Sequence, residues 1–167
     1  MKKKGLLLCI IGLIVLFSLF LFRPVYHLTT DNEIIQFINK HETLLQSVFN
    51  EMKAGPNIIR KYEPFASSDV KKIFRNSTIT RIVYNHQDDT FTFISSEFGI
   101  LPETDEYLIY ALDIDMLELG REHRIFESEW HFEQIDDSTI QWTSGTKYIL
   151  VKMLLPNWYH IYCYLPT

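Results

Sequence analysis

The feature that most constrains the fold of this sequence is a series of short alternating segments between Ile79 and Tyr164. Apolar and polar residues alternate in several of the segments, and β-branched and aromatic residues are frequent in all of them, as in half-buried strands. The segments cover residues 79–84, 90–95, 107–112, 128–135, 139–143, 148–154 and 158–164. Most of the gaps between them are short and carry turn-forming residues, whereas a parallel crossover needs a dozen residues or more. The sequence therefore predicts an antiparallel sheet in meander order.

One long helix is predicted before the sheet. Thr30-Asp31-Asn32-Glu33 matches a capping box, and Gly55-Pro56 is a stop signal, so the helix should run over residues 31–54. Its apolar residues recur with helical spacing, at Ile34, Ile38, Leu45, Val48 and Met52. A second, short helical turn is predicted after a cap near Ser67.

The predicted helix and sheet should pack together, because a sheet with one apolar face must bury that face against another layer. Alternation across the last hairpin puts the more apolar set on one face, namely Ile149, Val151, Met153, Tyr159, Ile161 and Cys163. We expect the helix over 31–54 to cover this face. The predicted fold class is α+β, with an N-terminal transmembrane helix followed by one amphipathic helix packed on an antiparallel β-meander sheet.

The N-terminal segment has a different composition. The 18 residues from Gly5 to Phe22 carry no charge and lie between Lys4 and Arg23. As a helix they would be about 27 Å long, close to the roughly 30 Å hydrocarbon core of a bilayer. Bulky residues stand where a signal peptidase would need small ones. We therefore expect an uncleaved signal anchor that contacts the lipid bilayer through residues 5–22.

The charges around this span predict its orientation. Three lysines precede it and one arginine follows it, which places the N-terminus in the cytoplasm and the C-terminal domain outside the cell membrane. After residues 1–23 are set aside, 12 basic residues remain against 21 acidic ones, a net charge of -9. The expected organisation is a cytoplasmic tip and anchor at 1–23, a short linker at 24–30 and a single α+β extracytoplasmic domain at 31–167.

Several classes of protein are excluded by composition and by missing motifs. A net charge of -5 for the whole chain does not suit nucleic-acid binding, and two cysteines cannot form a disulfide-rich scaffold. The sequence contains no Gly-x-Ser-x-Gly, Walker, GxGxxG or CxxC motif. We therefore expect no cofactor and no nucleic-acid partner.

The candidate catalytic residues lie on one predicted strand. Alternation within 128–135 sends Glu129, His131 and Glu133 to one side of the strand, and Trp130 and Phe132 to the other. Two carboxylates around an imidazole could bind a metal or transfer protons. The motif has no second half, however, and polar residues on an outer strand face are also what solvation alone predicts. No metal site is assigned on this pattern.

A candidate partner or ligand surface lies on the last two predicted strands. Their outer face would carry Tyr148, Leu150, His160, Tyr162 and Tyr164. This set is too apolar for a surface that only meets water, so it indicates either an interaction surface or a face covered by another part of the chain.

Three functions remain open at this stage. The leading hypothesis is a non-catalytic, single-pass membrane-anchored module whose small acidic domain binds another membrane or envelope protein. The first alternative is a membrane-tethered metal-dependent or acid/base enzyme that uses Glu129, His131 and Glu133. The second is a small-ligand sensor or carrier, which would need a cavity of roughly 300 Å³ or more between helix and sheet.

Overall fold

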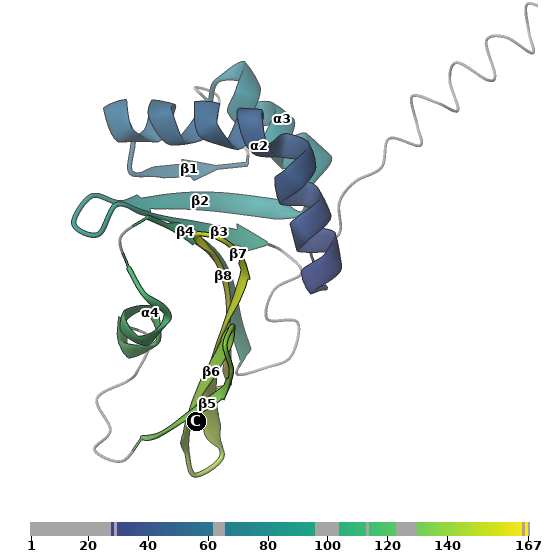
Figure 1. The fold of residues 1–167 in the computed structure, drawn as a ribbon. Coiled ribbons are helices and arrows are strands. Elements are labelled where there is room, and N and C mark those ends of the chain that lie inside the picture. The colour runs from purple at the N-terminus through teal and green to yellow at the C-terminus, as the bar shows by residue number, and fades with distance from the viewer. Residues whose placement is uncertain are drawn as a thin grey trace, which may run out of the picture.

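The chain forms an α+β fold built on one antiparallel sheet of eight strands (Figure 1). The computed structural model describes residues 28, 30–61, 66–95, 104–112, 114–122, 130–164 and 166. The predicted membrane span at 5–22 lies outside these residues. Within the described ranges, no helix is both long and apolar enough to cross a bilayer.

The strands follow the alternating segments of the sequence closely. They are β1 (Ile58–Arg60), β2 (Ile79–Asn85), β3 (Thr90–Ser95), β4 (Thr104–Ala111), β5 (His131–Asp136), β6 (Thr139–Ser144), β7 (Lys147–Leu155) and β8 (Trp158–Tyr164). All seven predicted strands are present. The short β1, which pairs with β2, was not predicted.

The prediction of a single meander is wrong at one step. The strand order is β1-β2-β3-β4-β8-β7-β6-β5, so two meanders of four strands meet where β4 pairs with β8. The connection from β4 to β5 contains helix α4 (Met116–Glu122) and is long enough to cross the width of the second meander. As a result the chain re-enters the sheet at its far edge and returns strand by strand to β4.

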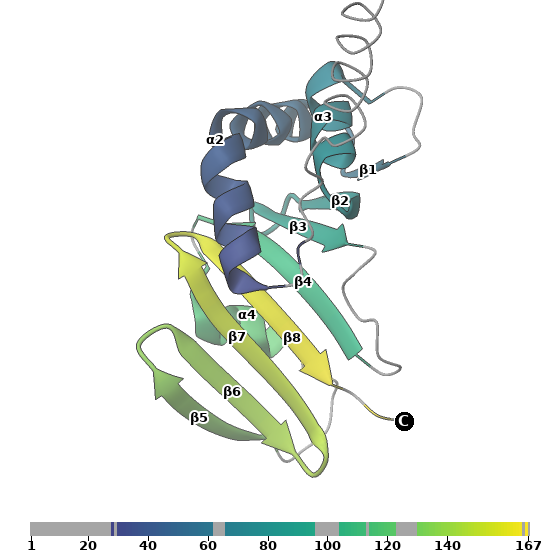
Figure 2. The same cartoon turned by 90° about the vertical axis from the view of Figure 1, so that its right-hand side faces the viewer.

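Helix α2 (Asp31–Ala54) has the predicted limits but is not straight. Its capping box is confirmed, since the Glu33 amide donates to the Thr30 hydroxyl at 3.3 Å and the Thr30 amide donates to the Glu33 carboxylate at 3.1 Å. At His41 the backbone leaves helical geometry, with φ -114° and ψ 16°. Two arms therefore meet at an angle, as Figures 1 and 2 show. The bend keeps the apolar residues of both arms buried against a curved sheet.

Two hydrophobic cores lie on opposite faces of the sheet. The first is formed by α2, by α3 (Ser68–Asn76, capped by Ser67 as predicted) and by side chains such as Phe91, Phe93, Leu108 and Trp158. The second is covered by α4 and includes Ile140, Trp142, Ile149, Val151, Tyr159, Ile161 and Cys163. In Figure 2, α2 lies in front of the upper ends of β7 and β8, and α4 lies behind them.

This arrangement corrects the predicted packing of helix on sheet. The apolar face around Ile149, Val151 and Ile161 is buried as predicted, but α4 covers it instead of α2. The reason is the β4–β8 pairing, which puts Leu108 and Trp158 in the core of α2 and leaves the reverse face to the β4–β5 connection. Cys163 is buried within this second core.

Candidate functional site

Four of the five residues predicted as a partner surface form a compact patch on the sheet face opposite α4, and the fifth, His160, lies next to them on β8. We call Tyr148 and Leu150 of β7 with Tyr162 and Tyr164 of β8 the tyrosine face. Tyr148 pairs with Tyr164, and Leu150 pairs with Tyr162, across the β7–β8 ladder. The ring of Tyr148 lies 5.6 Å from that of Tyr162 and 5.7 Å from that of Tyr164. All four side chains are half-buried.

The strand register brings the catalytic candidates onto the same face. His131 pairs with Thr143, which pairs with Tyr148, and Glu133 pairs with Gln141, which pairs with Leu150. Residues directly opposite in neighbouring strands point to the same side of a sheet. The two groups of residues that the sequence suggested separately are therefore parts of one surface that runs from β5 to β8.

His131 and Glu133 lie at the open end of this surface. Both are exposed on β5, the edge strand of the sheet, while Glu129 lies outside the described residues. In the part of the chain that the structure describes, no three His, Cys, Asp or Glu side chains are grouped closely enough to hold a metal ion. The arrangement offers polar side chains to a partner, and catalysis by Glu129, His131 and Glu133 stays a prediction.

Glu106 is a further member of this surface and does not belong to the candidate residues named from the sequence. It belongs to β4 and pairs with Tyr162 of β8. Burial raises the pKa of Glu106, and the nearby charge of His160 partly opposes that rise. Burial, with a hydrogen bond to Tyr162, also raises the pKa of Tyr148. The surface thus combines aromatic rings and hydroxyls with a partly desolvated carboxyl group.

An ionic cluster borders the tyrosine face at the end where helix α2 begins. The Asp31 carboxylate accepts from Lys152 Nζ at 2.6 Å and lies 3.0 Å from His160 Nδ1. It therefore ties the first residue of α2 to β7 and β8. Burial alone would raise the pKa of Asp31, but the hydrogen bonds from Lys152 and His160 outweigh it, and the pKa is lowered.

Replacing Asp31 with asparagine should make stability less dependent on pH in the acid range. Because the pKa of Asp31 is lower in the folded state, its ionised form contributes stability above the ordinary value of 3.8, and this is lost as the pH falls through the folded-state pKa. For a partly exposed cluster we expect about 1 kcal/mol. Urea denaturation of the full-length chain at pH 6 and pH 3 should show a smaller difference between wild type and Asp31→Asn at pH 3 than at pH 6. Asp137→Asn, at an exposed turn position, is the control, and a constant difference would contradict the assignment.

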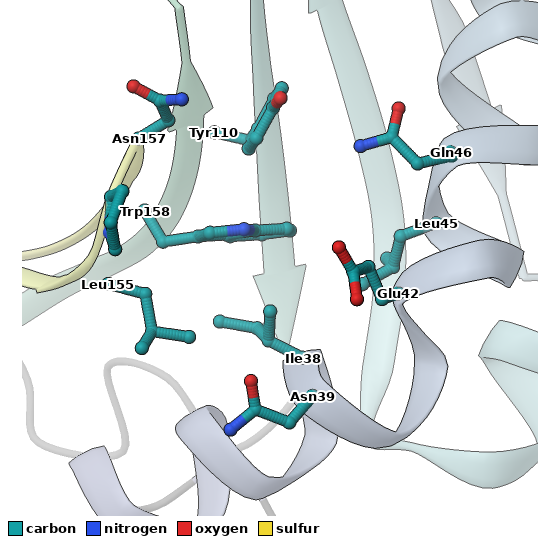
Figure 3. Close-up of a pocket in the computed structure, with 10 residues that line it drawn as sticks. Ile38, Asn39, Glu42, Leu45, Gln46, Tyr110, Leu155, Asn157 and Trp158 are labelled. Carbon is teal, nitrogen blue, oxygen red and sulfur yellow. The ribbon is translucent and has the colours of Figure 1, made fainter.

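A pocket of about 330 Å³ lies between the bend of α2 and the β7–β8 turn (Figure 3). We call it the elbow pocket. It is lined by Ile38, Asn39, Glu42, Leu45, Gln46, Tyr110, Leu155, Pro156, Asn157 and Trp158. None of these residues belongs to the candidate catalytic residues or to the five-residue partner surface named above. Its volume exceeds the roughly 300 Å³ required by the small-ligand hypothesis.

Comparison with known proteins adds no functional assignment. No protein-family model matches the sequence, and no curated protein or solved structure is significantly similar to it. Function must therefore be inferred from the tyrosine face and the elbow pocket themselves.

Proposed function

We propose that this chain is a non-catalytic, single-pass membrane-anchored binding module that docks another envelope protein on its tyrosine face. The observation that supports the proposal is a contiguous, half-exposed set of three tyrosines and a leucine on a sheet face whose reverse is packed under α4. Tyrosine is enriched in protein interfaces because it combines a large apolar ring with a hydroxyl at low conformational cost.

The predicted anchor determines where such a partner would be met. Residues 5–22 would span the membrane, with the N-terminus in the cytoplasm and the domain outside. The seven-residue linker 24–30 can extend at most about 25 Å. Asp31, directly after it, is bonded to Lys152 and His160 beside the tyrosine face. The tyrosine face would therefore stay close to the external surface of the cell membrane, within reach of the external part of another membrane protein.

The negative charge of the domain limits which kind of partner surface can bind it. The domain beyond residue 23 has a net charge of -9, and Glu106 and Glu133 lie on the docking surface itself. A complementary surface would present an apolar centre surrounded by lysine or arginine side chains. The enzyme alternative has less support, because His131 and Glu133 are exposed on an edge strand.

Site-specific photocrosslinking in intact cells tests the docking proposal. A benzophenone side chain at Leu150 should give one discrete adduct, while the same group at Leu117, which is exposed on α4, should not. The double variant Tyr148→Ser/Tyr162→Ser should reduce the Leu150 adduct about tenfold or more, since interface tyrosines often contribute 1–2 kcal/mol each. Equal adducts from both positions, or an undiminished adduct in the double variant, would exclude docking on this face.

A further inference from the structure

The elbow pocket owes its shape to the bend of α2. Ile38 and Asn39 line it from the arm before His41, and Glu42, Leu45 and Gln46 line it from the arm after. In a straight helix, residues 38 and 46 would lie along one continuous ridge. The bend instead turns both arms toward the same space, which the β7–β8 turn closes from the opposite side.

The wall opposite the helix is firmly held. The Ala111 amide donates to the Asn157 carbonyl at 3.0 Å, which fixes the β7–β8 turn to the end of β4. The rings of Tyr110 and Trp158 lie 5.0 Å apart, and Tyr110 also stacks on Phe49 at 4.6 Å. A pocket with such a wall is preformed, so a ligand would meet a small ordering cost on binding.

The described side chains that line the pocket include a negatively charged group but no positively charged one. Among the described residues that line the pocket, Glu42 is the only ionisable acid or base apart from the phenol of Tyr110, and none is a lysine, arginine or histidine. Asn39, Gln46 and Asn157 add neutral polar groups, and the remaining surface is aliphatic or aromatic. Figure 3 shows the Glu42 carboxylate turned toward the outer end of the Trp158 indole.

A carboxylate beside an indole and a phenol is suited to a positive charge. The carboxylate supplies a direct ionic attraction, and an aromatic ring adds to it where the cation lies over the face of the ring, tryptophan most strongly. An anionic ligand would face Glu42 without any compensating cation, in a domain whose net charge beyond residue 23 is -9. A volume of about 330 Å³ is at the lower end of small-molecule sites, which limits the ligand to a small molecule.

We propose that the elbow pocket binds a small organic cation, with its ammonium group held by the Glu42 carboxylate beside the Trp158 indole. This proposal does not depend on docking at the tyrosine face. It identifies the ligand of the sensor or carrier hypothesis by chemical class, as an amine or quaternary ammonium compound with an apolar body that contacts Ile38 and Leu155.

Titration of the full-length chain with choline as a probe tests the proposal. The neutral isostere 3,3-dimethyl-1-butanol has nearly the same shape without the charge. Choline should shift the indole N–H signal of Trp158 in an NMR spectrum, with that signal assigned by its loss in Trp158→Phe. The alcohol should bind about tenfold more weakly or not at all.

Two glutamates of the same helix provide a matched pair of variants. Glu42→Gln removes the charge from the pocket while keeping the side-chain shape, and it should weaken choline binding about tenfold. Glu51→Gln removes the same charge from a position of α2 outside the pocket and should leave the affinity unchanged. Equal binding of choline and the alcohol, equal effects of the two variants, or no choline-dependent shift at Trp158 would each overturn the proposal.

Discussion

Replacing Phe49 with alanine is expected to lower the free energy of unfolding by about 3 to 5 kcal/mol, the usual cost of removing a fully buried aromatic ring. Phe49 is 3 % exposed and lies at the centre of the aromatic cluster that joins α2 to the sheet. Its ring lies 4.3 Å from that of Phe91, 4.6 Å from that of Tyr110 and 6.0 Å from that of Trp158. Alanine would leave a cavity bounded by aromatic rings that belong to β3, β4 and β8.

Urea denaturation of the full-length chain, followed by circular dichroism, measures this loss. Phe132→Ala is the matched control, because it makes the same chemical change on β5 at a side chain that is 42 % exposed. The control should cost about 1 kcal/mol, mostly from its contact with Trp142. If Phe49→Ala cost no more than Phe132→Ala, the aromatic cluster would not be the junction between α2 and the sheet.

Helix and strand limits could be predicted because their signals are local in sequence. The capping box at Thr30 and the Gly55-Pro56 stop bracket α2, whose observed limits are Asp31–Ala54. Strand β8 has its predicted limits, Trp158–Tyr164, since its alternation is uninterrupted between a turn and the end of the pattern. By contrast β1 has only three residues, too few for alternation to be recognised.

The bend of α2 has a signal in the sequence, but it is not one of the usual ones. Helix α2 contains no proline or glycine, the residues found at most sharp kinks. The apolar stripe is nevertheless interrupted between Ile38 and Leu44 by a full turn of polar residues. Such a gap leaves one turn without an aliphatic side chain to bury, with only the half-buried ring of His41 packed on Phe37, and the helix can bend there without losing aliphatic core contacts. The elbow pocket follows from that bend and was missed with it.

Pairing between distant strands was beyond sequence reasoning. Nothing local to β4 or β8 specifies that they pair, yet this contact separates the two cores and gives α4 the face expected for α2. Within the second meander, His131 pairs with Thr143 and Glu133 pairs with Gln141, whose partners on β7 are Tyr148 and Leu150, so two candidate sites become one surface. The residues of the tyrosine face could be named from alternation alone, but not their neighbours on β4, β5 and β6.

Replacing Gly120 with alanine is expected to destabilise the fold by about 2 kcal/mol, which is opposite in sign to the usual effect. In an ordinary helix interior, glycine to alanine stabilises by roughly 0.5 to 1 kcal/mol. At Gly120 of α4, however, a Cβ atom would lie 1.9 Å from Cζ3 and 2.1 Å from Cη2 of the Trp142 indole. Trp142 is 2 % exposed within the second core, so it has little room to move, and overpacking of this kind typically costs about 1 to 3 kcal/mol or more.

A double-mutant cycle with Trp142→Leu separates this clash from any general intolerance of α4 to substitution. Leucine at 142 removes the indole atoms that the new Cβ would meet, although Trp142→Leu is itself destabilising because it leaves a cavity. In that background Gly120→Ala should cost at least about 1 kcal/mol less than in the wild type, since contacting residues show coupling energies of about 0.5 to 3 kcal/mol. Urea denaturation of the four full-length proteins measures the cycle. If the losses of unfolding free energy in the two single variants simply added up in the double variant, Gly120 would not pack against Trp142. The conclusion that α4 covers the second core would then be wrong.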